Sequence, residues 1–239
     1  MCKVCHFSYN LFRPSTRLVV SLVRGKLSPV ELKISAQARG TRILALNKAS
    51  KYRSICDALA HIALANGAEE LILPLIEPCS LYLPISNQLY TVKDNSPENK
   101  KAPVCVRPDG VATCSAIAQG VWRERQDVKV FYVTKCLRRP PPQLGHHREF
   151  TQFGYQILNP RSDHSDWIMS LARKMVACFT NEYTINVVSP RYPFDIEEFD
   201  VTVSYLGAEK QGQSGRLCSG GRYINGYGIT LEVERIMLL

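Results

Sequence analysis

Residues 105–157, CVRPDGVATCSAIAQGVWRERQDVKVFYVTKCLRRPPPQLGHHREFTQFGYQI, decide the fold of this chain. Residues 128–138 are rich in β-branched and aromatic side chains and predict a strand. Residues 148–157 predict a second strand. The linking residues 140–147 are neither helix nor ladder, because three consecutive prolines remove three backbone donors. An extended piece carrying an acid, Arg107–Gly110, and a helix precede this hairpin.

The second predicted strand has one unusually polar face. Its even positions include Arg148, Gln152 and Gln156, and residues two apart in a strand point to the same side of the sheet. An antiparallel pair of strands with a basic loop and a polar face predicts a small-molecule site whose base is formed by the sheet.

Bulk composition indicates a globular protein. The chain has 239 residues, 45% of them hydrophobic, which is enough for a substantial core and excludes wholesale disorder. No apolar run approaches the ~20 residues that a membrane-spanning helix needs. The nine cysteines lack a framework spacing and indicate reduced thiols, so we predict a cytoplasmic protein. Cys2-x-x-Cys5-His6 matches a haem-attachment string or half of a zinc site, but no second ligand pair is visible and we predict no metal.

Positive charge is concentrated at the N-terminus. Residues 1–56 contain 11 of the 30 Lys and Arg residues but only one of the 21 acids, Glu31. We predict a basic extension or targeting segment over residues 1–38, followed by a core over residues 39–239. Three interpretations of the extension stay open: a transit peptide for mitochondrial import, an arm that binds tRNA or other RNA phosphates, or a segment without a role.

Apolar periodicity and turn residues predict the other elements. They are a helix within residues 40–66, a buried strand over 69–78, an irregular segment over 79–104, a helix over 162–179, two strands within 183–206, and a strand–strand–helix series over 217–239.

This series resembles the histidyl-tRNA synthetases, a class II aminoacyl-tRNA synthetase family. Residues 137–156 align without gaps with that family's motif 2, and residues 217–239 are similar to its Gly-Gly-Arg-Tyr histidine motif followed by motif 3. The helix, glycine turn and proline-bearing strand before residue 80 look like motif 1, which builds the family's dimer interface. The resemblance implies an α+β fold, an antiparallel β-sheet flanked by helices. It also implies a homodimer through residues 40–80 and a catalytic core without an anticodon-binding domain.

By resemblance, the site binds histidine and ATP with Mg²⁺ and forms the aminoacyl-adenylate. Arg138 would bridge the α-phosphate and the substrate carboxylate, and Arg235 would hold the γ-phosphate; a guanidinium fork suits both tasks. The implied histidine-binding residues are Asp109, Gln152, Gln156, Gly220, Gly221, Arg222 and Tyr223, and the implied ATP-binding residues are Arg138, His146, Arg148 and Arg235.

The amino-acid side of this site departs from the family at three positions. Asp109 stands where the family has the Glu that pairs with the substrate ammonium, and Val111 replaces the neighbouring Thr. Gln156 replaces a Glu that receives the imidazole, so we expect an uncharged acceptor in place of an anion.

The ATP side departs further. Pro140 and Pro141 stand in for a Glu and an Arg, His146 for a loop arginine, and Thr230 and Glu232 for two motif 3 glycines. An arginine-bearing family element has no clear counterpart, although residues 191–194 (RYPF) fall near its place. Losing one preorganised charge typically costs a factor of about 10²–10³ in rate. Three functions therefore stay open: an adenylate-forming ligase, a histidine-binding regulatory subunit of the ATP phosphoribosyltransferase type, and an RNA-binding adaptor.

Overall fold

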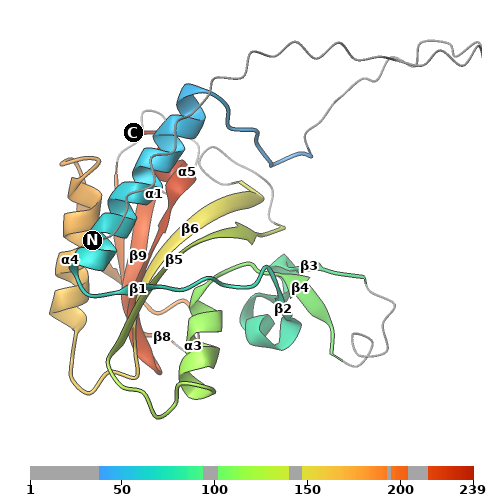
Figure 1. Ribbon diagram of the computed structural model, residues 1–239, viewed down its shortest axis with the longest axis vertical. Coiled ribbons are helices and arrows are strands. Elements are labelled where there is room, and N and C mark those ends of the chain that lie inside the picture. The colour runs from blue at the N-terminus through green and yellow to red at the C-terminus, as the bar shows by residue number, and fades with distance from the viewer. Residues whose placement is uncertain (1–37, 94–101, 140–146, 193–194, 204–214) are drawn as a thin grey trace, which may run out of the picture. The chain divides into compact units, whose positions relative to one another are not determined.

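The predicted hairpin lies in the main sheet of the computed structural model, between the edge strand β1 and the central strand β10 (Figure 1). Strand β5 (Val128–Leu137) and strand β6 (Glu149–Leu158) pair antiparallel along their whole lengths, with Val128 opposite Leu158 and Leu137 opposite Glu149. The structure describes residues 38–93, 102–139, 147–192, 195–203 and 215–239. The predicted basic extension therefore lies outside the described residues, except for Ala38.

Seven strands form the main sheet in the order β1-β5-β6-β10-β9-β8-β7. All neighbours are antiparallel except β1, which runs parallel to β5. The remaining strands of this sheet are β1 (Glu69–Glu70), β7 (Thr184–Val188), β8 (Asp195–Thr202), β9 (Arg216–Tyr223) and β10 (Gly226–Glu232). The predicted α+β class with a mainly antiparallel sheet is confirmed.

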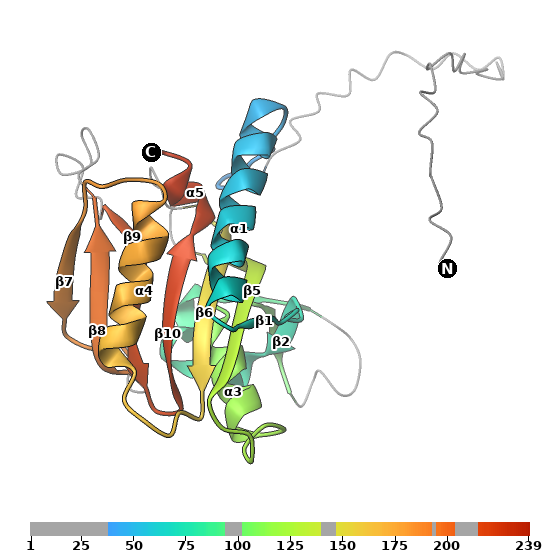
Figure 2. The same cartoon turned by 60° about the vertical axis from the view of Figure 1, so that its left-hand side comes forward.

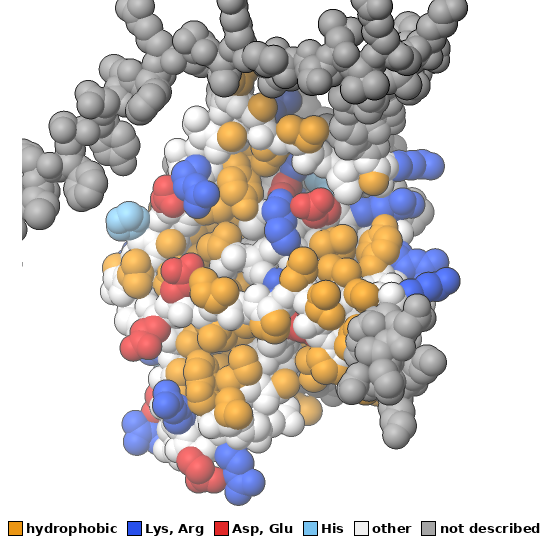
Figure 3. All heavy atoms as spheres, turned by 45° about the vertical axis from the view of Figure 1, so that its right-hand side comes forward, with side chains coloured by type: hydrophobic (Ala, Val, Ile, Leu, Met, Phe, Trp, Pro, Cys, Tyr) orange, Lys and Arg blue, Asp and Glu red, His pale blue; other side chains and the backbone are white. Residues whose placement is uncertain are grey.

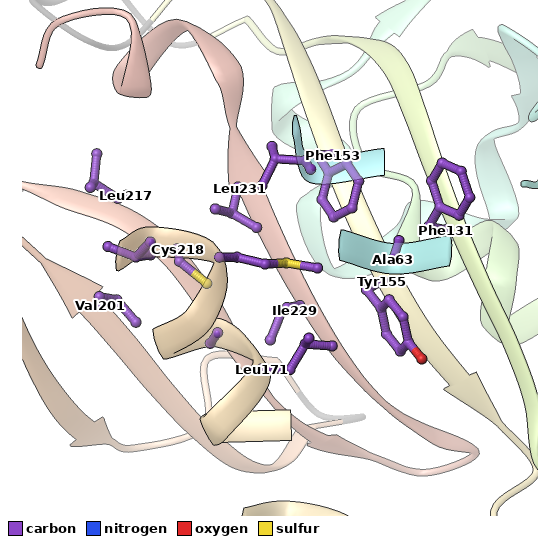
Figure 4. Packing of buried hydrophobic residues seen from close by; sticks show 14 of the residues in the cluster. Ala63, Phe131, Phe153, Tyr155, Leu171, Val201, Leu217, Cys218, Ile229 and Leu231 are labelled. Carbon is purple, nitrogen blue, oxygen red and sulfur yellow. The ribbon is translucent and has the colours of Figure 1, made fainter. Parts of the chain in front are cut away.

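Two long helices cover one face of this sheet. Helix α1 (Asn47–Ala65) and helix α4 (Ser165–Ala177) lie side by side over the strands (Figure 2), and the short α5 (Val233–Ile236) follows β10. The odd positions of β6, among them Phe153, Tyr155 and Ile157, point to this side and are fully buried. Figure 4 shows Phe153 and Tyr155 packed with side chains from the helices and neighbouring strands. The core therefore contains the apolar side chains at the odd positions of β6.

The opposite face carries smaller elements. Helix α3 (Val111–Gln119) packs there against Tyr132 and Leu158, through Cys114 and Ala118. The chain before α3 forms a three-stranded sheet in the order β2-β4-β3, with a kinked 3-10 helix between β2 and β3. These elements are β2 (Ile76–Pro78), the 3-10 helix η1 (Cys79–Gln88), β3 (Tyr90–Thr91) and β4 (Val104–Val106).

Two sequence predictions are wrong here. Residues 69–78 do not form one buried strand: β1 pairs with the main sheet, β2 pairs with the small sheet, and Pro74 between them has no N–H to continue a ladder. Ile72 is 83% exposed and Ile76 is 53% exposed, because the described chain places no layer over them. The segment 79–104 is also more regular than predicted, since η1 occupies ten of its residues.

None of the helices in the described residues is both long enough and apolar enough to cross a bilayer.

Candidate functional site

Two adjoining pockets lie on the sheet face opposite α1 and α4. The first, called here the glycine pocket, has a volume of about 740 Å³ and includes Gln156, Gly220, Gly221 and Gly228 in its lining. The second, called here the arginine pocket, has a volume of about 510 Å³ and includes Arg138, Arg191, Arg216 and Arg235. Asp109, Arg138, Tyr192, Glu198, Ser219 and Thr230 line both pockets, so the two form one continuous site.

Strand β6 supplies polar side chains to both pockets, as its alternation predicted. Gln152 faces the arginine pocket and Gln156 the glycine pocket. Both side chains are buried, although each carries an amide. A buried amide is expensive unless it is hydrogen-bonded, so these two positions mark a site and not ordinary core.

Asp109 is held in place by three donors. Its Oδ1 accepts from the backbone N–H of Val111 at 2.7 Å. Its Oδ2 accepts from Gln152 Nε2 at 2.8 Å and from Arg138 Nη2 at 2.9 Å. Gln152 Oε1 in turn accepts from the backbone N–H of Gly110 at 2.8 Å. Gln152 therefore fixes the turn that presents Asp109 to the pockets.

A buried network of charged groups and hydroxyls stabilises the turn that carries Asp109. Glu77 and Arg107 lie 3.6 Å apart, each with a side chain only 2% exposed. Tyr82 donates to Glu77 and lies 2.9 Å from the backbone carbonyl oxygen of Asp109, while Thr113 donates to Glu77 at 2.8 Å. Burial, reinforced by the bond to Glu77, raises the pKa of Tyr82, which keeps its hydroxyl protonated as a donor. The network ties β2, η1 and α3 to the segment that carries Asp109.

The arginine pocket balances its positive charges with carboxylates. Arg138 pairs with Asp109 at 2.9 Å, and Arg235, 2% exposed, pairs through Nε with Glu232 at 2.7 Å. Although burial opposes its charge, the carboxylates of Asp109 and Glu232 raise the pKa of Arg138. Glu232 therefore acts electrostatically on both arginines that the sequence assigned to ATP.

The remaining two arginines of this pocket show the same pairing. Arg191 contacts Glu198 Oε1 at 2.6 Å and also pairs with Asp200. Arg216 lies 3.9 Å from Asp200. The hydrogen bond to Asp200 is the main cause that raises the pKa of Arg191. Four arginines thus face four carboxylates in and beside this pocket.

Glycines line part of the glycine pocket, so the backbone there is not covered by side chains. Gly221 has φ +149°, and a Cβ there would clash with the backbone oxygen of Glu197 on the paired strand β8. A Cβ at Gly228 would clash with the side chain of Gln156. A larger residue is excluded at Gly221 by backbone atoms and at Gly228 would displace the Gln156 amide, so a ligand can approach the backbone closely here.

Most residues predicted for the site are brought together. Seven of them line the glycine pocket and two more line the arginine pocket. The first group is Asp109, Arg138, Gln156, Gly220, Gly221, Arg222 and Tyr223; the second adds Gln152 and Arg235.

Two predicted ATP-binding residues are not placed in these pockets. Arg148 lines neither of them; its backbone N–H donates to Gly40 at 2.9 Å and its Nη1 donates to the Arg39 carbonyl at 3.4 Å. His146 lies outside the described residues.

The sequence located residues 191–194 near an arginine-bearing family element without giving them a role in the site, and it missed the contribution of β8. Arg191 and Tyr192 line the arginine pocket, and Asp195, Glu197 and Glu198 line the glycine pocket. The detectable signal was the run of acids over residues 195–200, next to an arginine and within a predicted strand. Its significance depended on the pairing of β8 with β9, which local sequence does not reveal.

The residues described here offer no obvious metal centre. No three His, Cys, Asp or Glu side chains in the described ranges gather closely enough to hold an ion.

Comparison with known sequences finds one family repeatedly. The family model described as "Histidyl-tRNA synthetase" matches residues 40–190. The histidine–tRNA ligase of Clostridioides difficile (strain 630) is 28% identical over 159 residues, which are 62% of this chain and 36% of that protein. The corresponding ligase of Aquifex aeolicus (strain VF5) is 28% identical over 138 residues, 54% of this chain and 33% of that protein. The matched region is about a third of each relative's length.

Comparison with solved structures gives the same fold. Apo histidyl-tRNA synthetase of S. aureus superposes with a TM-score of 0.65 at 19% identity, covering 84% of this chain and 69% of that one. A histidine–tRNA ligase subunit from Alicyclobacillus acidocaldarius gives 0.69 at 12% identity, covering 91% and 98%. A Bacillus halodurans C protein described as an ATP phosphoribosyltransferase regulatory subunit/histidyl-tRNA synthetase gives 0.68 at 12%, covering 88% and 83%. At these identities the likeness concerns the fold alone.

Proposed function

Since this chain belongs to the histidyl-tRNA synthetase family, we propose that its core binds histidine, or a close chemical relative, in the glycine pocket as a regulatory-type paralogue that forms little adenylate. One observation carries this proposal. The amino-acid side of the site is assembled around Asp109, whereas Arg235 on the ATP side is buried against Glu232. Asp109 and Arg138 also pair, but their side chains are 22% and 23% exposed and can exchange partners with a ligand ammonium and carboxylate, whereas a polyphosphate meets Arg235 buried in its pair.

Glu232 opposes the binding of a phosphate in the arginine pocket electrostatically. Two unit charges 4 Å apart interact by roughly 4 kcal/mol at the effective dielectric constant of ~20 typical near a protein surface. Glu232 would oppose a phosphate in the arginine pocket by an energy of that order, and binding would require Arg235 to leave its carboxylate. Glu198 and Glu232, two carboxylates of this pocket that would serve as ligands for the Mg²⁺ accompanying ATP, are paired with Arg191 and Arg235. This pocket therefore fits Mg²⁺–ATP poorly.

Adenylate formation is the second candidate function, and one observation favours it. Arg138 and Arg235, the two arginines that the family resemblance assigns to ATP, line the same pocket next to Asp109. In-line attack on the α-phosphate needs such a clustering of charge. The two functions differ in whether histidine stimulates exchange between ATP and pyrophosphate.

Calorimetry and pyrophosphate exchange test the proposal together. We expect histidine to bind in the absence of ATP, and histidine-dependent exchange to be no faster than in an Arg138→Ala variant. That variant removes the cation nearest Asp109 and sets the background of the assay. Exchange well above this background would instead identify an adenylate-forming enzyme, and the absence of any histidine binding would reject both functions.

We also propose that the protein is a homodimer through residues 40–80. Hydrophobic side chains gather into large clusters in the view that brings β2, β3 and β4 forward (Figure 3). Exposed apolar patches of this kind mark interaction surfaces in soluble proteins. Large exposed hydrophobic residues in and just after this segment are Ile43, Leu46, Leu64, Ile72, Leu75, Ile76 and Leu83.

An Ile76→Asp variant tests this interface. Burying an unpaired carboxylate between two copies is costly, so we expect the variant to elute as a monomer where the unmodified protein elutes as a dimer in light-scattering chromatography. Val121→Asp is the matched control, because Val121 is 83% exposed but lies outside the segment. A monomeric unmodified protein, or equal behaviour of both variants, would contradict the proposal.

The N-terminal extension keeps its sequence-based interpretations. RNA binding by the basic arm and mitochondrial import both depend on residues 1–38, almost all of which lie outside the described residues. Both remain predictions from charge and composition.

A further inference from the structure

Gln156 presents an unused hydrogen-bond donor to the glycine pocket. It lies in the middle of β6, opposite Val130 of β5 and Gly228 of β10, and it is fully buried. Its Oε1 accepts a hydrogen bond from the Tyr223 hydroxyl at 2.9 Å. Its Nε2 is buried and finds no hydrogen-bond acceptor in the structure. An unsatisfied buried donor costs about 1–3 kcal/mol, so a side chain held this way calls for a ligand acceptor.

Tyr223 determines which end of the amide faces the ligand. The phenol is buried in β9, and burial raises its pKa well above 10, so it stays protonated and donates. The side-chain oxygen of Gln156 is therefore occupied, and its NH₂ group remains for a ligand. The sequence suggested that Gln156 offers an uncharged acceptor in place of the family's anion. The structure reverses this expectation, because the free group is a donor.

The free donor of Gln156 limits which ligand side chains can bind in the glycine pocket. An imidazolium carries two N–H donors and no acceptor, whereas a neutral imidazole keeps one lone-pair nitrogen. We infer that the glycine pocket selects an amino acid whose side chain ends in an uncharged hydrogen-bond acceptor, and that it takes histidine in its neutral form. The inference rests on the proposed function, since it names the ligand form for the same pocket.

Charged groups around the pocket act on any amino acid and must be separated from this effect. Asp195 and Glu198 have pKa values raised by burial, so their attraction for a ligand ammonium weakens at a higher pH than for ordinary carboxylates. The titratable and charged groups in and around the pocket come from η1, the turn before α3, α3, β5, the turn before β8, β8 and β9. They are Tyr82, Asp109, Cys114, Tyr132, Arg138, Tyr192, Asp195, Glu197, Glu198, Arg222 and Tyr223.

A pair of ligands isolates the contribution of the imidazole. Histidine is compared with β-(1,2,4-triazol-3-yl)alanine, whose ring keeps its acceptors and remains neutral between pH 5.5 and 7.5. Both share the ammonium and carboxylate, so the action of the pocket carboxylates on those two groups cancels in the comparison. With the reference side-chain pKa of about 6.5 for histidine in model peptides, we expect the affinity of histidine relative to the triazole analogue to fall by up to about tenfold between pH 7.5 and 5.5. Calorimetry on the full chain measures both ligands at each pH.

Two variants identify Gln156 as the cause. Gln156→Glu restores an anionic acceptor, so the tenfold relative loss of histidine at pH 5.5 should disappear or reverse. Gln156→Met keeps a similar shape without the donor, and it should weaken both ligands at pH 7.5. Thermal unfolding of each variant confirms that it is folded before binding is interpreted.

The possible failures are distinguishable. If neither ligand binds at any pH, the proposed function itself fails. If histidine binds at pH 5.5 as well as at pH 7.5 relative to the triazole analogue, or if the analogue does not bind while histidine does, the inference about the side-chain acceptor is overturned and histidine binding stands. The inference is likewise overturned if Gln156→Glu has the same pH profile as the unmodified protein.

Discussion

Replacing Glu232 with glutamine should raise the affinity of the arginine pocket for ATP by roughly 10- to 100-fold, which corresponds to about 1.4–2.8 kcal/mol. Glu232 pairs with Arg235 at 2.7 Å, and its charge also acts on Arg138. Glutamine keeps the size of the side chain but removes the anion that competes with phosphate oxygens. Calorimetry with Mg²⁺–ATP measures the change directly.

Two controls separate this local effect from a change in net charge. Glu124→Gln removes the same charge from an exposed surface pair with Arg123, and neither residue lines either pocket. It should leave ATP affinity nearly unchanged. Adding Arg235→Ala to Glu232→Gln should abolish the gain, since the released arginine is what binds the phosphate. Equal effects of Glu232→Gln and Glu124→Gln would show that Glu232 does not block the pocket.

Replacing Arg107 with methionine should lower the free energy of unfolding by about 3–5 kcal/mol. The guanidinium pairs with Glu77, and both side chains are almost completely buried. Arg107 also donates to the side chain of Thr134 and to the backbone oxygens of Pro74 and Lys135. Without it, Glu77 becomes a buried carboxylate without its cation. Urea denaturation followed by circular dichroism gives the difference.

The double replacement makes this prediction specific to the ion pair. Removing Glu77 as well, by Glu77→Met in the Arg107→Met background, should cost less than the sum of the two single changes, because no charge is then left unpaired. Arg123→Met is the matched control, since Arg123 is 73% exposed and pairs only at the surface. Additive losses at positions 77 and 107 would mean that the two charges are not energetically coupled.

The buried network also links stability to the site. Tyr82 connects Glu77 to the backbone of Asp109, and Asp109 lies in both pockets. This arrangement explains why the segment before α3 can hold a carboxylate, a turn and an arginine partner together in one place. No feature of residues 107–110 alone predicts that Glu77, thirty residues earlier, supports them.

Sequence alone was enough to predict the hairpin of β5 and β6, the polar face of β6, the helices α1 and α4, and the family. These features follow from periods of two and 3.6 residues and from motifs that are continuous in the chain. Gln152 and Gln156 could be assigned to one face for that reason, and the structure buries both beside the pockets.

The contacts that those residues make depend on how distant parts of the chain pack together. Residues 69–78 are apolar enough to suggest a buried strand, but burial depends on what covers them, and Ile72 lies exposed. The pairing of Arg235 with Glu232, of Arg191 with Asp200, and of Tyr223 with Gln156 depends on strand register or on side-chain direction. Whether a charge is neutralised, and which end of an amide stays free for a ligand, therefore depends on contacts that the local sequence does not show. Local sequence therefore located the site, whereas the fold determined which of its donors and charges remain for a ligand.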